Sequence, residues 1–389
     1  MFNQSISETI KFQMTSNQAE LPFVLMPGEL TLEDIRHLLM NATKIKLTEE
    51  TFSKVGQSYQ LMKSLLNNGL SLKEMYQHFF HCFKNKVPKD DKAFHYLKSY
   101  ELGMGDSLDK EVIKLTLLLK INSLSQGFSG ISKGVLFYLI DFYNYQIYPK
   151  IPKKGASGVL GDANLLSYLG LCLMGKGHVY YQGKLTTAAS ALAAIGRLPL
   201  QLEEKDALSI LCGNEISLAS TLISVIHAQM NYSLATISSC FSLDALKGGI
   251  HPFHPSLSKL KNDQGQFIYS HAIFKLLEGS ENLSAFDKSK ITYPYSIMCQ
   301  PQIMGSIWQN IKEVAQAIIS EVNGVSDCLI LLPDTNEFIL SGNFHQENIV
   351  LNINKLVENS LHLGVLVHKK ISFFKKHLNT KYDDDLFDE

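Results

Sequence analysis

The amino-acid sequence predicts a mostly α-helical fold from three observations. Apolar residues recur every three or four positions through 303–322, which is the spacing of one helical face. The segment 216–243 contains no Asp, Glu, Lys or Arg, which suits a helix buried at the centre of a bundle or at a subunit interface. Strand patterns are few and fall at 179–184, 327–332 and 337–341. The sequence therefore indicates a bundle of long helices with few strands.

Other elements follow from local signals along the chain. The Asn-Asn-Gly sequence at 67–69 is a polar turn. Helices are predicted at 111–120 and 134–145, where apolar residues occur on more than one side. The end of the chain, 382–389, is acidic and is predicted to be frayed. Because no Pro-, Gly- or Ser-rich linker and no internal repeat divides the sequence, we expect one domain over residues 1–389.

Composition narrows the class of protein. Hydrophobic residues make up 45% of the 389 residues and charged residues 19%, so a sizeable core is possible. The net charge of −1 gives no general attraction to nucleic acid or an anionic membrane. The charge-free segment 216–243 is rich in Ser and Thr, which favours burial within protein over a bilayer. The six cysteines contain no C-x-x-C pair and no signal peptide is evident, so we expect a soluble, cytoplasmic protein with reduced thiols and no metal.

Several short stretches lie in a recognisable order along the chain. They are Ile121-Asn-Ser-Leu-Ser-Gln-Gly-Phe-Ser-Gly130, Tyr295-Ser-Ile-Met-Cys-Gln-Pro-Gln-Ile-Met-Gly305, Glu321-Val-Asn-Gly-Val-Ser-Asp327 and Ser341-Gly-Asn-Phe-His345. Together these stretches resemble the core of the histidine, phenylalanine and tyrosine ammonia-lyase family. The similarity extends from about residue 47 to residue 370.

The resemblance implies a nearly all-α, elongated subunit with central helices of the fumarase and aspartase type. It also implies a homotetramer in which three subunits contribute residues to each active site. Members of the family eliminate ammonia from an aromatic or imidazole amino acid. Their electrophile, methylidene-imidazolone, forms autocatalytically from an internal Ala-Ser-Gly and supplies covalent catalysis. A tyrosine on a mobile loop acts as base, and an arginine pairs with the substrate carboxylate.

The position of the electrophile-forming triad depends on the register of the alignment. Gly161 and Asp162 align with a Gly-Asp pair of the family. In that pair the glycine is the last residue of the triad and the aspartate directly follows it. In that register the triad is Val159, Leu160 and Gly161. Leucine has no hydroxyl to lose as water, so we expect no cofactor. The alternative triad, shifted by three residues, is Ala156, Ser157 and Gly158, and methylidene-imidazolone is expected only if these residues cyclise.

Most other catalytic positions of the family also carry different residues here. The base position aligns with Lys73, in a segment predicted to be an ordinary amphipathic helix. The histidine that selects the substrate ring becomes Tyr100, and the asparagine of the Asn-Gly-Thr motif becomes Cys212. A lone buried cysteine usually behaves as a small hydrophobe. The carboxylate-binding arginine becomes Met298, so a free amino acid loses its main anchor.

Three positions keep the family's residue type, namely Tyr295, Asn343 and Phe344. Packing alone could preserve them. The sequence also ends before the family's C-terminal helical extension. We therefore predict a diverged lyase in which Tyr295 and Lys73 handle protons, acting on an aromatic amino-acid-like substrate without a free carboxylate. The alternative is a non-catalytic protein that binds a small aromatic ligand. Partners would be further copies, as in a homotetramer, or an active paralogue.

Overall fold

The computed structural model describes residues 21–76, 91–155, 161–245, 250–284 and 293–377. Residues 156–160, which include most of both candidate triads, lie outside the described residues. The same is true of the acidic end at 382–389 and of the second half of the helix predicted around Lys73.

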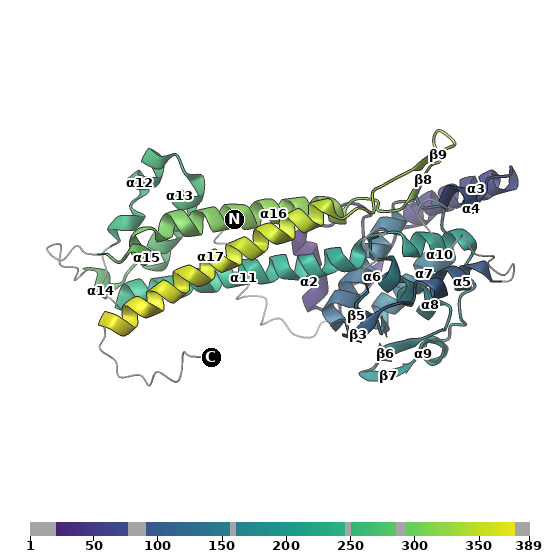
Figure 1. Ribbon diagram of the computed structural model, residues 1–389, viewed down its shortest axis with the longest axis horizontal. Helices are drawn as coiled ribbons and strands as arrows, with labels where there is room; N and C mark the ends of the chain where they lie inside the picture. The colour runs from purple at the N-terminus through teal and green to yellow at the C-terminus, as the bar shows by residue number, and fades with distance from the viewer. Residues whose placement is uncertain (1–20, 77–90, 156–160, 246–249, 285–292, 378–389) are drawn as a thin grey trace. The chain divides into compact units, whose positions relative to one another are not determined.

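The chain divides into two compact units, whose elements are labelled in Figure 1. The mixed unit comprises residues 18–223 and 317–350, and the helical unit comprises 1–17, 224–316 and 351–389. Helices α11 (Glu215–Ala245), α16 (Gln300–Val322) and α17 (Glu347–His377) have residues in both units. The expectation of a single domain stays a prediction.

The mixed unit contains helices and four small sheets. Its remaining helices are α2 (Leu32–Met40), α3 (Glu49–Asn67), α4 (Leu72–Tyr76), α5 (Lys92–Ser99), α6 (Lys110–Ser125), α7 (Lys133–Asn144), α8 (Ala163–Leu173), α9 (Ala188–Ala194) and α10 (Glu204–Leu211). Its strands are β1 (Phe23–Val24), β2 (Ile45–Lys46), β3 (Met104–Ser107), β4 (Tyr148–Pro149), β5 (Pro152–Lys154), β6 (His178–Tyr181), β7 (Lys184–Thr187), β8 (Leu329–Leu332) and β9 (Glu337–Leu340). Strands β1 and β2 are parallel, whereas β3–β5, β4–β6–β7 and β8–β9 are antiparallel.

Helix α6 forms the centre of the mixed unit. Every residue from Leu115 to Ser125 is buried, so the helix is enclosed on all sides. This accounts for the absence of a one-sided apolar pattern in its sequence, because a helix surrounded by protein needs no polar face. The neighbouring helix α3 starts at a capping residue. The Thr48 hydroxyl accepts a hydrogen bond from the Thr51 N–H in the first turn of α3. The helices predicted at 111–120 and 134–145 and the strands predicted at 327–332 and 337–341 are confirmed. The strand predicted at 179–184 instead covers most of β6, a two-residue turn and the first residue of β7.

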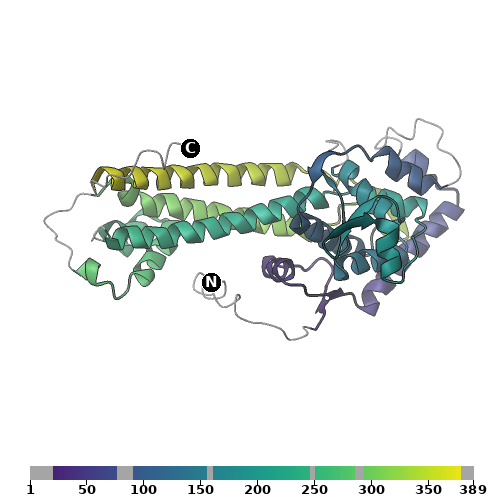
Figure 2. The same ribbon diagram turned by 90° about the horizontal axis from the view of Figure 1, so that it is seen from below.

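The helical unit is built on long stretches of α11, α16 and α17, which lie side by side in both views (Figure 1; Figure 2). Its shorter elements are η2 (His251–Phe253), α12 (Pro255–Lys261), α13 (Gln264–Leu276), α14 (Glu281–Ser284) and α15 (Tyr295–Met298). Asn310 of α16 donates a hydrogen bond to Asn359 of α17 over 3.0 Å, and Lys370 of α17 donates one to Ser239 of α11 over 2.6 Å. The predicted helix at 303–322 is confirmed within α16.

The polar side chains of the charge-free segment bond mainly to their own helix. The Ser233, Thr236 and Ser239 hydroxyls each donate to the carbonyl four residues earlier, over 2.6–3.0 Å. These bonds satisfy the hydroxyls without a solvent-facing side. The stretch Glu204–Ala245 is long and apolar enough to cross a membrane by length and composition, but 78% of its most apolar window is buried in the protein. A buried core helix meets the same criteria, so this is weak evidence for a span.

Two helices of the helical unit meet at a pair of glycines. A Cβ atom added to Gly305 of α16 would lie 2.4 Å from the backbone nitrogen of Gln266 in α13. A Cβ atom on Gly265 would lie 2.4 Å from the Gly305 carbonyl oxygen. Backbone atoms cannot move aside as a flexible side chain can, so this crossing requires glycine on both helices.

We expect Gly305→Ala to destabilise the protein by about 1–3 kcal/mol, because the methyl group separates α13 from α16. The matched control is Gly364→Ala in α17, where an added Cβ meets nothing within 4 Å. The control should be neutral or stabilise by up to about 1 kcal/mol through helix propensity. Urea unfolding followed by circular dichroism measures both changes. Equal stability of the two variants would contradict the close helix crossing.

Candidate active site

Three helix N-termini in the mixed unit meet around Gly161. Gly161 precedes α8, Gly213 precedes α11, and Phe344 precedes α17. Gly161 has a φ of +62°, and a Cβ atom there would lie 2.4 Å from the Gly213 carbonyl oxygen and 3.2 Å from that of Phe344. Only glycine combines this backbone conformation with so close an approach. The partial positive charges of helix N-termini favour negative charge at such a point.

Asp162 connects these three segments through its hydrogen bonds. Its backbone N–H donates to the Gly213 carbonyl over 3.0 Å. Its carboxylate accepts from the backbone N–H and hydroxyl of Ser217, over 2.8 and 2.6 Å, and from the Gln346 amide over 3.1 Å. Burial raises the pKa of Asp162, while these hydrogen bonds act to lower it. The Asp162 carboxylate thus links the N-terminal ends of α8, α11 and α17 through hydrogen bonds.

Two buried ion pairs lie beside this junction. Lys120 of α6 donates to Glu215 over 3.1 Å and to the Cys212 carbonyl over 2.6 Å. Lys205 of α10 donates to Asp327 over 3.1 Å. All four charged side chains are almost wholly inaccessible to solvent. Burial lowers the pKa of Lys205, and the charge of Asp327 partly offsets that effect.

Cys212 and Cys328 form a disulfide bond next to these charges. The expectation of reduced thiols is therefore wrong for this pair, and Cys212 is not a lone small hydrophobe. The two residues are 116 positions apart, so spacing in the sequence gave no indication of the bond. A carboxylate oxygen of Asp327 lies within 4.8 Å of both sulfur atoms, so the three residues are grouped as the ligands of a metal ion would be. However, the two sulfurs are bonded to each other and the carboxylate is paired with Lys205, which opposes cation binding in this state.

The other predicted residues of the mixed unit are spread over several elements. Lys73 is exposed on the short helix α4, in agreement with the predicted helical segment. Tyr100 is half-buried at the C-terminal end of α5. Asn343 is exposed and donates to the Val325 carbonyl over 3.1 Å, whereas Phe344 is buried. The fold therefore brings Cys212 and Phe344 to the helix junction around Gly161.

Tyr295 and Met298 belong to α15 in the helical unit. Their side chains are 74% and 47% exposed. Contact with the Cys299 thiol raises the pKa of Tyr295, which favours its protonated phenol. These two predicted site residues are therefore accessible to solvent in a single subunit.

Sequence reasoning missed the charged residues behind the junction: Lys120, Lys205, Glu215 and Asp327. One signal could have found Lys120. It interrupts the apolar run from Leu117 to Ile121, and a charge within a fully apolar helix needs a buried partner. The identity of that partner was not deducible, because Glu215 lies 95 residues away.

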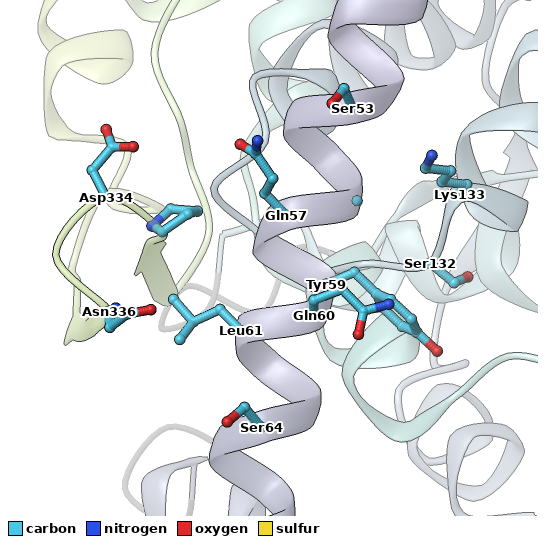
Figure 3. A pocket seen from close by; sticks show the side chains of 12 residues that line it. Ser53, Gln57, Tyr59, Gln60, Leu61, Ser64, Ser132, Lys133, Asp334 and Asn336 are labelled. Carbon is cyan, nitrogen blue, oxygen red and sulfur yellow. The ribbon is translucent and has the colours of Figure 1, made fainter.

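A large open groove lies elsewhere on the mixed unit (Figure 3). Its volume is about 980 Å³, and most of the residues that line it are of polar type, including Gln57, Lys133 and Asp334. Gln57 and Leu61 point from α3 toward the turn that carries Asp334 and Asn336. None of the described site residues is among those that line it. The groove is therefore separate from the helix junction.

Comparison with known proteins gives the family. The sequence profile of the aromatic amino acid lyases matches residues 30–386. The chain belongs to this family. A histidine ammonia-lyase from Burkholderia mallei (strain NCTC 10229) is 31% identical over 352 residues, a match that covers 90% of this chain and 69% of the relative.

Two solved structures share the fold. The ergothionase of Treponema denticola superposes with a TM-score of 0.83 at 24% identity, covering 90% of this chain and 71% of that enzyme. The histidine ammonia-lyase of Trypanosoma cruzi gives a TM-score of 0.79 at 23% identity, covering 90% and 66%. The predicted family and the mostly α, ammonia-lyase-like fold are thus confirmed.

We expect Lys120→Met to destabilise this lyase-family protein by about 3–5 kcal/mol, because it leaves Glu215 buried without its cation. The double variant Lys120→Met/Glu215→Leu should recover much of that loss. A matched control is Lys54→Met, which breaks an exposed pair with Glu50 and should cost below about 1 kcal/mol. Chemical denaturation of the four proteins measures the difference. An effect of Lys120→Met no larger than that of Lys54→Met would contradict a buried, desolvated pair.

Proposed function

We propose that this protein catalyses a carbon–nitrogen elimination without methylidene-imidazolone, on an aromatic or imidazole amino-acid derivative. The observation that carries the proposal is the packing of Gly161. The position must be glycine, since a side chain there would overlap the Gly213 carbonyl. This supports the register in which Gly161 is the last residue of the triad.

In this register the residue before Gly161 replaces the serine of the family's triad, and that residue is Leu160. The electrophile requires a hydroxyl that can leave as water, and leucine has none. The residues present therefore do not fit the group in this register. The helix junction is well ordered by hydrogen bonds, with Asp162 bonded to Ser217 and Gln346. A helix junction without the electrophile favours a substrate that needs no electrophilic activation.

A quaternary ammonium group meets this requirement. Its nitrogen already carries a full positive charge and has no proton, so it leaves as a neutral tertiary amine. A base takes the β-proton, the carbon–nitrogen bond breaks, and its electron pair departs with the amine as a carbon–carbon double bond forms. The likeness to the Treponema denticola enzyme, named for degrading ergothioneine, supports this class. Ergothioneine is an imidazole amino-acid derivative with a trimethylated nitrogen.

The candidate proton-handling residues are Tyr295 and Lys73. Both are exposed, which suits a site completed by a second subunit of a homo-oligomer such as a tetramer. Met298, in the position of the family's arginine, offers no charge for a carboxylate. The proposed substrate is therefore one whose carboxylate is esterified, amidated or carrier-bound.

A second candidate function is a non-catalytic subunit that binds a small aromatic ligand or assembles with an active paralogue. The Cys212–Cys328 bond favours it, because this bond replaces a hydrogen-bonding asparagine with a buried, covalently closed sulfur pair. Such a pair offers a ligand neither an amide nor a free thiol. An exposed Tyr295 could then serve a partner's site.

We expect the intact mass of the purified protein to lack the loss of two waters, about 36 Da, that forms methylidene-imidazolone. Incubation with the methyl ester of ergothioneine, which has no free carboxylate, should release trimethylamine, and histidine, phenylalanine and tyrosine should release no ammonia. Tyr295→Phe should abolish turnover without changing the melting temperature, since this side chain is largely exposed. Cys299→Ser, which alters its neighbour, is the matched control and should retain turnover.

The outcomes separate the two candidates. A mass lower by about 36 Da together with ammonia release from histidine would overturn the proposal and restore Ser157 as the source of the electrophile. An unmodified mass with no turnover of any derivative would favour the non-catalytic subunit. Mixing with an active paralogue, followed by native mass spectrometry, would then detect hetero-oligomers.

A further inference from the structure

The Cys212–Cys328 bond joins two segments at the helix junction. Cys212 ends α10 three residues before α11 begins, and Cys328 directly precedes β8. Their Cα atoms are 6.1 Å apart, a separation that a disulfide spans without backbone movement. The bond therefore ties the start of α11 to the segment 326–328.

Neither cysteine is accessible in the folded protein. Cys212 is 1% exposed and Cys328 is 0% exposed. A soluble thiol must contact one of the sulfurs to break the bond, so reduction requires local opening of the structure. Cys299 provides an internal comparison, since it is a free, only partly buried cysteine.

Noncovalent contacts hold the same two segments together. Lys120 donates to both the Cys212 carbonyl and Glu215, and the Ser326 hydroxyl donates to the same Glu215 oxygen over 3.0 Å. None of these contacts involves a sulfur atom, so they can persist when the disulfide is broken. Two thiols kept next to each other re-form their bond intramolecularly, at a high effective concentration.

We propose that Cys212 and Cys328 act as a reversible redox lock on the N-terminus of α11. In the oxidised state the bond fixes α11 against the segment 326–328, and in the reduced state only noncovalent contacts, among them those of Lys120, Glu215 and Ser326, hold it there. The inference does not rest on the proposed function, because the lock is a property of the fold.

The redox partner is a small thiol–disulfide couple such as glutathione. A glutathione thiolate attacks one sulfur, the protein disulfide breaks, and a mixed disulfide forms. A second glutathione displaces the protein sulfur. The products are two protein thiols and one glutathione disulfide. The protein disulfide is reduced by two electrons, and the two glutathione thiols are oxidised. Reoxidation by glutathione disulfide is the reverse reaction.

The first test equilibrates the full-length protein in glutathione buffers of graded potential. Acid quenching, alkylation with N-ethylmaleimide and peptide mass spectrometry then report each cysteine. Cys212 and Cys328 should convert together in a single two-electron transition, while Cys172 and Cys299 are alkylated throughout. A cross-link that resists every buffer would overturn the lock in favour of a permanent bond. Absence of the cross-link in every buffer would overturn it as well.

Stoichiometric binding of zinc to the reduced protein would also overturn the proposal. The two sulfurs and Asp327 would then form a metal site. We expect no such binding, because the Lys205 ammonium is paired with the Asp327 carboxylate. Isothermal titration of the reduced protein with zinc chloride tests this outcome directly.

The second test measures hydrogen exchange at the start of α11. Backbone amides of residues 218–223 should exchange at least about tenfold faster in the reduced protein, while those in the middle of α3 should not change. Cys328→Ser should exchange like the reduced protein in every buffer, and Cys172→Ser should keep the redox response. Equal exchange in both wild-type states would overturn the lock, and this comparison needs no variant to fold.

Discussion

The Lys120–Glu215 ion pair is the contact on which the site region of the mixed unit depends. It lies where solvent is excluded, so neither charge is tolerable without the other. Through it the central helix α6 holds the start of α11, and Ser326 joins the same carboxylate. The position of α11 then determines where Gly213 meets Gly161. One buried pair thus sets the geometry of the helix junction.

The residues at the junction fall into two groups, those that hold the helices together and those expected from the family resemblance to carry chemistry. Asp162 holds the helices through hydrogen bonds that it accepts from Ser217 and Gln346. Cys212, which the sequence resemblance predicts to replace an asparagine of the family, is part of a disulfide. Scaffold contacts are buried and mutually dependent, so a single replacement among them is costly. A reactive side chain at the edge of a site can be replaced without loss of the fold.

Covalent and ionic contacts reinforce each other around the start of α11. The disulfide reaches the segment 326–328 through Cys328, and the ion pair of Lys205 reaches it through Asp327. In each ion pair one lysine faces one carboxylate, so the charges of each pair balance. The state of the sulfurs can therefore change without leaving an uncompensated charge in the interior.

The sequence by itself determined the helices, the few strands and the lyase family, because periodicity and short motifs are local properties of the chain. The resemblance also predicts positions where family residues are replaced, and these stay predictions. Only the tertiary structure paired Cys212 with Cys328 and Lys120 with Glu215, across 116 and 95 residues. Such partners are chosen by burial and distance, which depend on how every intervening element packs.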